Sequence, residues 1–380
     1  MSPALRGLTW DHPRGYRVLD TLAGRLTPGL VVRWDRQPLE DFESRPLRTL
    51  ADDYDLLVID HPGLGEAVRD GALRPVTDLF TPGELARWRA GSAGASFGSY
   101  RLAGRQWGLP LDAAAQVAVT RPDLTAARPA SWDEAVQLAG TVPTALCLGG
   151  PHALLMFSAI CVAAGSPPAT DGPEYVPATA GAGALEVMAA LLERADRDLS
   201  GRNPIAVLDA MAALDGPAYC PLVFGYVNYQ RPDHERGRRG LQFFDAPAGS
   251  GGIGSVLGGT GLAVTRSCTQ LAAAAALIRE LLSGPVQTRM FAAHGGQSAA
   301  AAAWLDPGAD AASGGFYRAT WATVQRAWVR PRFAGYLEFQ AAASAVLRDG
   351  LLAGDAPGHL VSQVNELFAA ARRSRSTADG

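Results

Sequence analysis

Two short loops of this chain combine side chains that can transfer protons or bind a polar molecule. Trp10, His12 and Arg14 lie in the loop at residues 10–16, and Asp60 and His61 adjoin at the end of an apolar run. An imidazole close to a carboxylate can act as a general base, and the same groups can hydrogen-bond a ligand without changing it. The two loops therefore leave two functions open, ligand binding and acid–base catalysis.

Both loops follow segments with the composition of buried β-strands. Residues 8–10 and 31–34 predict short strands, and residues 54–60 predict a strand covered on both faces, because most of its residues are apolar. Helical segments alternate with these strands, which predicts an α/β sheet with right-handed crossovers. Ligands of such sheets bind beyond the carboxyl ends of the strands, where both loops lie.

The middle of the chain is richer in predicted helix. Ser131 is expected to cap a helix together with Glu134, three residues later. Residues 168–182 are rich in Pro, Gly, Ala and Thr and are predicted to form a long loop. The glycines at 249–261 favour a close backbone approach to a ligand, or a crossing between lobes, over a phosphate loop, because no dinucleotide-binding spacing is present.

The composition excludes several reaction classes. The chain contains no lysine, which excludes Schiff-base chemistry, pyridoxal phosphate held through an amine, and a nucleotide loop that needs a lysine. The four cysteines lie apart without zinc spacing and are expected to pack inertly in a reducing compartment. A formal net charge of −3, with acids and bases mixed, disfavours nucleic acid as a partner. We expect neither a cofactor nor a bound metal.

Length and the first residues set expectations about organisation and location. A chain of 380 residues exceeds one ordinary core, so two lobes are expected. The chain begins almost directly on a predicted strand without a basic and apolar leader, which predicts a cytoplasmic protein. Removal of a leader would instead place it in the periplasm or outside the cell. The apolar stretches are too short to span a bilayer, so no membrane insertion is expected.

Three blocks of sequence occur in an informative order. The first comprises GRQWGLPLD at 104–112, QVAVTRPDL at 116–124 and PASWDE at 129–134. The second is GGTGLAV at 258–264 with the helix that follows, and the third is RPRFAGY at 330–336. Together they resemble the family 1 extracellular solute-binding proteins, the sugar-type binding components of ABC transporters. Trp107 replaces the family's usual tyrosine, and Thr120 departs from its pattern before the arginine.

The resemblance implies a type II periplasmic-binding-protein fold. This fold is α/β and bilobal, and each lobe is a mostly parallel sheet flanked by helices. The expected lobes are residues 1–112 with 256–310, and residues 113–255 with 311–380. Hinge crossings are expected near Asp112, Ser255 and Asp310. A small-molecule ligand would bind between lobes that close on it, and a transporter or a regulatory protein is the expected protein partner.

The resemblance also implies which residues face the cleft. The candidate ligand-binding residues are Trp10, His12, Arg14, Tyr16, His61, Asp112, His152, Tyr226, Tyr229, Gly259, Thr260, Arg332 and Tyr336. Aromatic rings would stack on the ligand, and Arg14 or Arg332 would hold a carboxylate or phosphate through paired hydrogen bonds. A helix N-terminus at His152 favours an anion as well. We therefore expect a small polar or anionic organic ligand.

An enzyme on the same scaffold is the alternative. Some relatives of this scaffold are enzymes, thiaminase I among them, with a cysteine nucleophile and a carboxylate base. In a cytosolic enzyme of this kind, His12, His61 and Asp112 would be the acid–base residues. Cys147 and Cys220 would be the nucleophile candidates, although neither has a basic neighbour in the sequence. Binding without catalysis is the favoured function.

Overall fold

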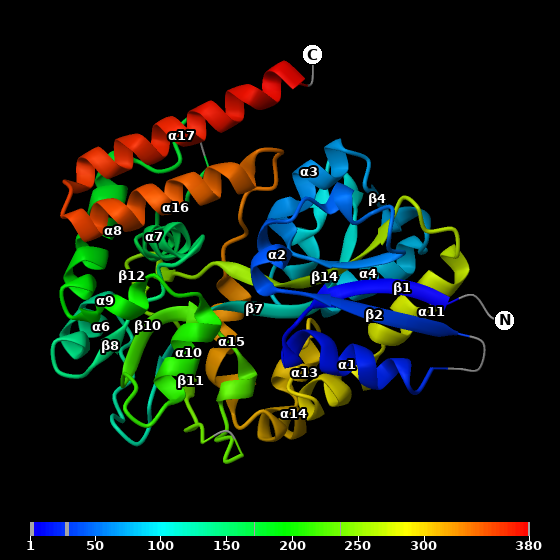
Figure 1. Ribbon diagram of the computed structural model, residues 1–380, viewed down its shortest axis with the longest axis horizontal. Coiled ribbons are helices and arrows are strands. Elements are labelled where there is room, and N and C mark those ends of the chain that lie inside the picture. The colour runs from blue at the N-terminus through cyan, green and yellow to red at the C-terminus, as the bar shows by residue number, and fades with distance from the viewer. Residues whose placement is uncertain (1–3, 27–29, 171, 236, 379–380) are drawn as a thin grey trace.

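Two long antiparallel strands run through the centre of the molecule and join its two lobes (Figure 1). The structure is a computed structural model that describes residues 4–26, 30–170, 172–235 and 237–378. The central strands are β7 (Gly108–Thr120) and β14 (Leu257–Thr265). Every residue of β7 is buried, as expected of a strand that is covered on both faces.

The N-terminal lobe, which we define by strands β1–β4 and the helices around them, places its parallel strands in the order β2–β1–β3. β3 pairs antiparallel with β14, so the sheet continues into the central strands. The strands are β1 (Ala4–Trp10), β2 (Val31–Gln37), β3 (Leu56–Ile59) and β4 (Leu73–Arg74). The helices are α1 (Pro13–Ala23), α2 (Leu39–Ser44), α3 (Leu64–Arg69), α4 (Pro82–Gly91) and α11 (Leu271–Leu281).

The second lobe continues the same sheet from β7 through β10 and β8 to β9. β10 is antiparallel to β7, whereas β10, β8 and β9 are parallel to one another. The strands are β8 (Thr144–Ala145), β9 (Ala195–Asp196), β10 (Tyr219–Phe224) and β11 (Gln242–Phe244). The helices are α6 (Trp132–Ala139), α7 (His152–Ala163), α8 (Ala178–Leu192), α9 (Arg197–Ser200), α10 (Pro204–Ala212), α16 (Tyr336–Ala353) and α17 (Pro357–Ala378).

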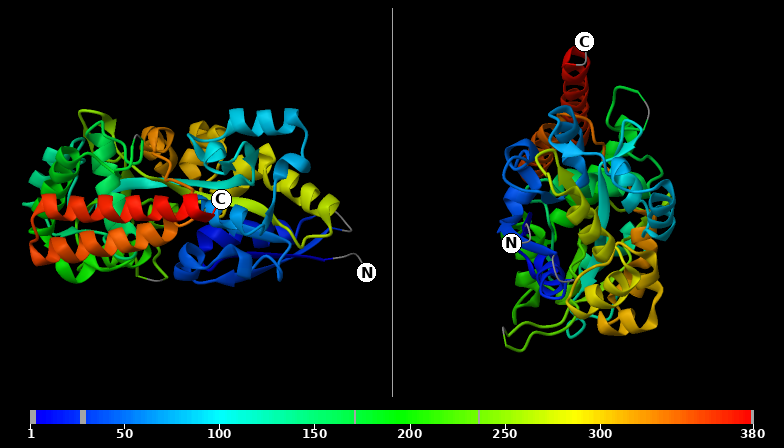
Figure 2. Two further views of the ribbon diagram at one scale, coloured as in Figure 1. Left: turned by 90° about the horizontal axis from the view of Figure 1, so that it is seen from above. Right: turned by 90° about the vertical axis from the view of Figure 1, so that its right-hand side faces the viewer.

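Helix α7 forms the centre of the helical layer of the second lobe. All of its residues except Val162 are buried, and it packs against α8 and α16. A helix that is apolar on all sides has to be covered on all sides. α16 provides part of this cover, α17 packs on α16 and α8, and both lie along the outside of the lobe (Figure 2).

Short helices lie beside the central strands between the two lobes (Figure 1). They are α12 (Phe291–Ala293), α13 (Ala301–Leu305), α14 (Pro307–Ala312) and α15 (Phe316–Arg326), of which α15 contacts β7 and β11. The remaining elements are η1 (Leu47–Thr49), η2 (His61–Gly63), η3 (Val76–Asp78), α5 (Ser96–Ser99), β5 (Arg101–Leu102), β6 (Arg105–Gln106), η4 (Val227–Tyr229), β12 (Ala248–Gly249), β13 (Gly252–Ile253) and η5 (Val286–Met290).

The predicted α/β architecture is confirmed, with parallel strands in the outer part of each lobe and antiparallel strands at the centre. The loop predicted at residues 168–182 was wrong from residue 178 onward, because α8 begins at Ala178. A Cβ atom on Gly181 would lie 2.7 Å from the Val361 side chain. The small residues that resemble a loop thus allow α8 to pack closely on α17. The lobe boundaries stay a prediction.

Candidate functional site

The turn after β1 brings the first group of predicted residues together. His12 caps α1, because its Nδ1 accepts a hydrogen bond from the Arg14 amide at 3.2 Å. Pro13 follows at the first helical position, where its fixed φ suits the start of a helix. Arg14 then reaches the central strand β7, where it meets Asp112. We refer to Trp10, His12, Arg14, Asp112 and Tyr226 as the Arg14 cluster.

Arg14 and Asp112 form a buried, bidentate ion pair. Arg14 Nε donates to Asp112 Oδ2 at 2.9 Å, and Nη2 donates to Oδ1 at 2.5 Å. The Arg14 Nη1 donates to the carbonyl of Gly225 at 3.1 Å. Burial lowers the pKa of Arg14, but the Asp112 carboxylate more than offsets this and raises it above its ordinary value. Every nitrogen of this guanidinium therefore already has a protein partner.

Aromatic rings enclose this ion pair. The guanidinium carbon of Arg14 lies 4.9 Å from the centre of the Tyr226 ring and 5.7 Å from that of Trp10. His12 stacks on Trp10 with ring centres 5.0 Å apart. Burial and the positive charge of Arg14 lower the pKa of His12 to about 3, so this imidazole is neutral at pH 7. The cluster is a packed junction of both lobes with β7.

The backbone at this junction explains the glycines of the second sequence block. Thr260 pairs with Asp112 and Gly259 with Ala113 in the ladder between β14 and β7. Gly259 has a φ of 95°, and a Cβ atom there would lie 2.4 Å from the Asp112 carbonyl oxygen. Only glycine adopts this conformation without strain and tolerates this contact. The close backbone approach predicted from these glycines is therefore an approach of β14 to β7.

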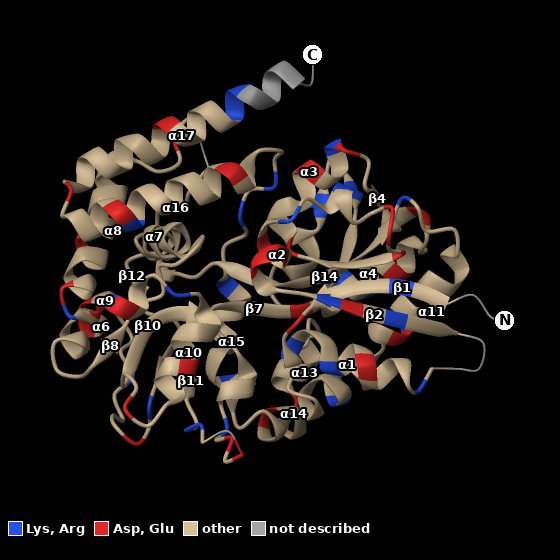
Figure 3. Ribbon diagram, viewed as in Figure 1, with Lys and Arg blue, Asp and Glu red and all other residues tan. Residues whose placement is uncertain are grey.

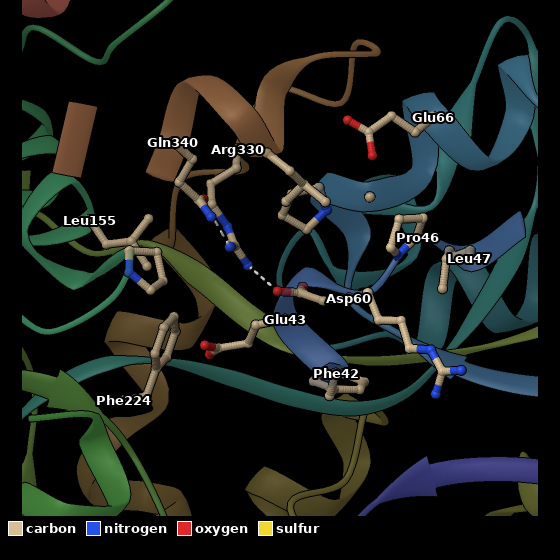
Figure 4. Close-up of a pocket in the computed structure, with 15 residues that line it drawn as sticks. Phe42, Glu43, Pro46, Leu47, Asp60, Glu66, Leu155, Phe224, Arg330 and Gln340 are labelled. Carbon is tan, nitrogen blue, oxygen red and sulfur yellow. Dashed lines mark hydrogen bonds and ion pairs between the residues drawn. The ribbon is translucent and has the colours of Figure 1, made fainter. Parts of the chain in front are cut away.

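A second group of polar residues surrounds a cavity between the lobes, which Figure 4 shows. The N-terminal lobe contributes Phe42 and Glu43 from α2 and Asp60 from the end of β3, and the second lobe contributes Phe224 and Gln340. Arg330 comes from the segment between α15 and α16. We call this the Arg330 cavity. Its volume of about 40 Å³ is well below the 300–1,000 Å³ of typical small-molecule sites.

Arg330 connects the two lobes across this cavity. Its Nη2 donates to Asp60 Oδ2 at 2.7 Å, and its Nη1 donates to Gln340 Oε1 at 3.3 Å. The Arg330 side chain is 4% exposed, and its Nε has no hydrogen-bond partner among the described residues. Burial raises the pKa of Asp60, but Arg330 and then His61 more than compensate, so the pKa is well below its ordinary value. Asp60 is thus ionised.

The pKa of Glu43 is shifted in the opposite direction to that of Asp60. Burial, and then the negative charge of Asp60, raise its pKa to about 8, against the smaller influence of Arg330. No hydrogen bond or ion pair joins its carboxyl group to another described residue. In Figure 4 this carboxyl group points into the cavity toward Phe224, below the Asp60–Arg330 pair. The cavity therefore contains a carboxyl group that is protonated at pH 7 and has no protein partner.

Two histidines adjoin residues that line this cavity. His61 Nδ1 is 3.2 Å from Asp60 Oδ1, and burial lowers its pKa to about 4. His152 begins α7 and meets Phe224 edge-on at 5.8 Å between ring centres. Burial, and then the charge of Arg330, lower the pKa of His152 to about 3. The Nε2 atoms of both rings are buried without a partner among the described residues.

Four other predicted site residues belong to neither group, although the Tyr229 ring packs edge-on against Tyr226 of the Arg14 cluster. Tyr16 is covered by Arg36, whose guanidinium carbon is 3.5 Å from the ring centre, and Tyr229 donates to Asp209 at 2.8 Å. Arg332 donates to the carbonyls of residues 98 and 99 at 2.8 and 3.0 Å. Tyr336 is fully buried between Phe333 and Phe339. Their role as ligand contacts stays a prediction.

Several residues of the Arg330 cavity were missed by the sequence interpretation. They are Phe42, Glu43, Phe224, Arg330 and Gln340. A signal for Arg330 was present, because it lies in the same block as Arg332, two residues away. Glu43 stands in a short polar helix with nothing to distinguish it from Glu40 or Asp41.

The two cysteines considered as nucleophiles are buried thiols. Burial raises the pKa of Cys220 to about 12 and that of Cys147 well above its ordinary value. Among the described residues, no three His, Cys, Asp or Glu side chains gather as a metal site would need. No helix within the described ranges is long and apolar enough to cross a membrane. Acidic and basic residues are interspersed over both lobes (Figure 3).

Comparisons with known proteins place the fold. No family model and no curated protein matches the sequence. The maltose-bound MalE3 of T. maritima gives a TM-score of 0.81 at 17% identity, over 96% of this chain and 98% of that one. An ABC transporter solute-binding protein of Agrobacterium radiobacter, in complex with ribitol, gives 0.80 at 17% identity, over 97% and 98%. The chain has the fold of the solute-binding proteins.

A third structure extends this likeness. The solute-binding protein of Thermotoga lettingae bound to α-D-tagatose gives a TM-score of 0.79 at 16% identity, over 97% of this chain and 100% of that one. The solute-binding-protein fold implied by the three sequence blocks is thereby confirmed. Because the coverage is nearly complete in both directions, this chain has no large insertion or missing lobe relative to these structures.

Proposed function

We propose that this protein binds a small polar organic ligand between its lobes and closes around it. The observation that carries this proposal is the Arg330 cavity, in which charged and aromatic side chains of both lobes face one space. Arg330 bonds to Asp60 in the N-terminal lobe and to Gln340 in the second lobe. A ligand there contacts both lobes only in the closed form, so it shifts the equilibrium toward closure.

The size of the cavity implies that the lobes move apart to admit a ligand. A volume of about 40 Å³ holds water but no sugar-sized molecule. The contacts between the lobes include an exposed one, from Asn203 Nδ2 to Glu40 Oε1 at 3.0 Å. Opening would separate this contact and the Asp60–Arg330–Gln340 connection, while β7 and β14 remain continuous between the lobes.

The chemistry of the cavity favours a ligand rich in hydroxyl groups. Carboxylate and guanidinium groups form paired hydrogen bonds with such ligands, and the faces of Phe42 and Phe224 cover their apolar side. The two arginines expected to clamp an anion, Arg14 and Arg332, are already bonded to protein acceptors. The comparison structures were solved with maltose, ribitol and tagatose, which supports this class. As partner we propose a transporter or regulatory protein that recognises the closed form.

A retention experiment tests the proposal. The purified protein is incubated with a metabolite library, and the retained compound is identified by mass spectrometry. Small-angle scattering with and without that compound then measures lobe closure. A compound that is returned unchanged and contracts the protein supports the proposal. Failure to retain any compound, without a change in scattering, contradicts it, and a retained compound of altered mass would indicate the enzyme alternative.

A further inference from the structure

The Arg330 cavity contains one carboxyl group that the protein itself does not satisfy. Arg330 bonds to Asp60 and Gln340, so these three side chains satisfy one another. Glu43 projects from α2 into the same space, and its carboxyl group has no hydrogen bond or ion pair with a described residue (Figure 4). Glu43 is partly buried, and a carboxyl group without a protein partner at a cavity wall is available to a ligand.

The charges around the cavity identify the sign of that partner. Glu43, Asp60 and Glu66 are its acidic lining residues, and Arg45 and Arg330 its basic ones. Arg330 is neutralised by Asp60 at 2.7 Å, and Arg45 is exposed to solvent. Once it is ionised, the carboxyl group of Glu43 thus has no counter-charge of its own among these lining residues. An anionic ligand would meet both Asp60 and Glu43, whereas a cation would complete the pairing.

Neutral and aromatic neighbours support the same conclusion. His61 and His152 carry no charge at pH 7, because burial lowers the pKa of both, and so they do not compensate Glu43. The Glu43 carboxyl group points toward Phe224 in Figure 4, and Phe42 lines the same cavity. Aromatic faces attract ammonium groups, most strongly where water is excluded.

We propose that the ligand of the Arg330 cavity is a hydroxylated amine, an amino sugar or amino polyol, whose ammonium group pairs with Glu43. This inference rests on the proposed function and narrows its ligand class. The hydroxyl groups of the ligand bond to Asp60, Arg330 and Gln340, and the ammonium group lies between Glu43 and the Phe224 ring. A neutral polyol occupies the same space without the ion pair.

Pairing of the ligand's ammonium group with Glu43 couples binding to the release of a proton. The charged groups that act on Glu43 are Asp60 at the end of β3, Arg330 before α16, and Glu40 on its own helix. Cys147 and Tyr226 are also near, and both stay protonated across the physiological range. Because the pKa of Glu43 is about 8, an ammonium ligand must displace its proton at pH 7. Affinity for the amine therefore rises with pH, by up to about tenfold per unit between pH 6 and 8.

The test uses three linear polyols that differ only at carbon 1: 1-amino-1-deoxy-D-sorbitol, sorbitol and gluconate. Isothermal titration measures each against the wild type, Glu43→Gln and Asp41→Asn. The Asp41→Asn variant is the matched control, because Asp41 is an exposed residue on the same helix and the substitution likewise replaces a carboxyl group by an amide. The wild type and Asp41→Asn are expected to bind the amine roughly tenfold more tightly than sorbitol or gluconate. Glu43→Gln loses this preference.

A second measurement follows the proton. Titration of the wild type with the amine at pH 7, in two buffers of different ionisation enthalpy, is expected to show release of about one proton per ligand, which Glu43→Gln does not show. The inference is overturned if the amine does not bind, if it is not preferred, or if Glu43→Gln keeps the preference. A neutral or anionic compound in the retention experiment overturns this inference alone, whereas retention of no compound overturns the proposed function.

Discussion

Two arginine–aspartate pairs of the described residues lie near the junction of the lobes, one buried and one partly buried, and their surroundings differ. Arg14 and Asp112 meet through two hydrogen bonds, and the rings of Trp10 and Tyr226 cover the guanidinium. Arg330 meets Asp60 through a single hydrogen bond, beside a cavity. An arginine–carboxylate pair in a cleft therefore does not by itself mark a ligand site. Free volume, an arginine nitrogen without a partner and the Glu43 carboxyl group distinguish the second pair from the first.

The different surroundings of these two ion pairs imply different roles for Arg14 and Arg330. Arg14 attaches α1 to β7 through Asp112 and to the second lobe through the Gly225 carbonyl, and none of its nitrogens is left for a ligand. Arg330 has an unpartnered Nε and faces a space that Glu43 shares. We expect the Arg14 cluster to determine stability and the Arg330 cavity to determine binding.

The largest effect on stability is expected from breaking the Arg14–Asp112 ion pair. Arg14→Ala leaves Asp112 buried without a counter-charge, and the free energy of unfolding should fall by about 3–5 kcal/mol. Urea denaturation measures this. The double variant Arg14→Met with Asp112→Leu removes both charges and should recover much of the loss. A cost below about 1 kcal/mol for Arg14→Ala would remove the contrast between the two pairs.

The next effect should separate binding from stability. Arg330→Ala is expected to weaken binding of the ligand found in the retention experiment by roughly tenfold or more, since it removes a charge-assisted hydrogen bond. Its cost in unfolding free energy should be about half that of Arg14→Ala or less, because Asp60 is 19% exposed and water can replace the partner. Titration calorimetry and urea denaturation measure the two quantities. Equal affinity of the variant and the wild type would contradict the assignment of the cavity.

A third effect is the pH dependence of stability that Glu43 alone contributes. Its folded pKa of about 8 exceeds the ordinary value of 4.5, so the folded protein holds a proton that the unfolded chain releases. This contribution to stability is complete below pH 4.5 and is lost as pH rises to 8. Glu43→Gln should remove the loss and be more stable than the wild type at pH 9, on the order of 2 kcal/mol. Melting temperatures of both proteins from pH 5 to 9 measure it, and parallel curves would contradict it.

The buried histidines make stability depend on pH in the opposite direction, and they do so in the wild type and in Glu43→Gln alike. The pKa values of His12, His61 and His152 are lowered to between about 3 and 4, so stability is lost as pH falls from 6.5 toward these values. The comparison of Glu43→Gln with the wild type cancels this contribution, which is why the variant is needed.

The smallest effect is expected at the exposed contact between the lobes. Glu40→Ala removes the acceptor of the Asn203 hydrogen bond and should change the free energy of unfolding by less than about 0.5 kcal/mol. Small-angle scattering of the ligand-free protein should shift toward the open form. A stability loss as large as that of Arg330→Ala would indicate that closure depends on the rim and not on the cavity.

The sequence was sufficient for the features that depend on near neighbours. The strands at residues 8–10, 31–34 and 54–60 appear as β1, β2 and β3, because a short apolar run is a local property. Ser131 caps α6 as predicted, with its Oγ accepting from the Glu134 amide at 3.2 Å, although the Glu134 carboxylate accepts from Ala130. The order of the three blocks was sufficient to predict the fold.

The site was predictable only in part, because its partners are distant in the chain. His12 and His61 follow parallel neighbours, as predicted, yet His12 packs on Trp10 while His61 faces Asp60. Arg332 was favoured over Arg330 within one block, since nothing local shows which of the two guanidinium groups faces the cavity. Glu43 carries no local signal, because its raised pKa comes from burial and from Asp60.

The sequence by itself thus determined the elements, the fold and the loops that approach the junction of the lobes. Only the tertiary structure decided which charges pair and which remain open to a ligand. Asp112 is 98 residues from Arg14, and Asp60 is 270 residues from Arg330. Local patterns record the preferences of a residue for its own helix or strand, whereas burial and charge pairing depend on segments that only folding brings together.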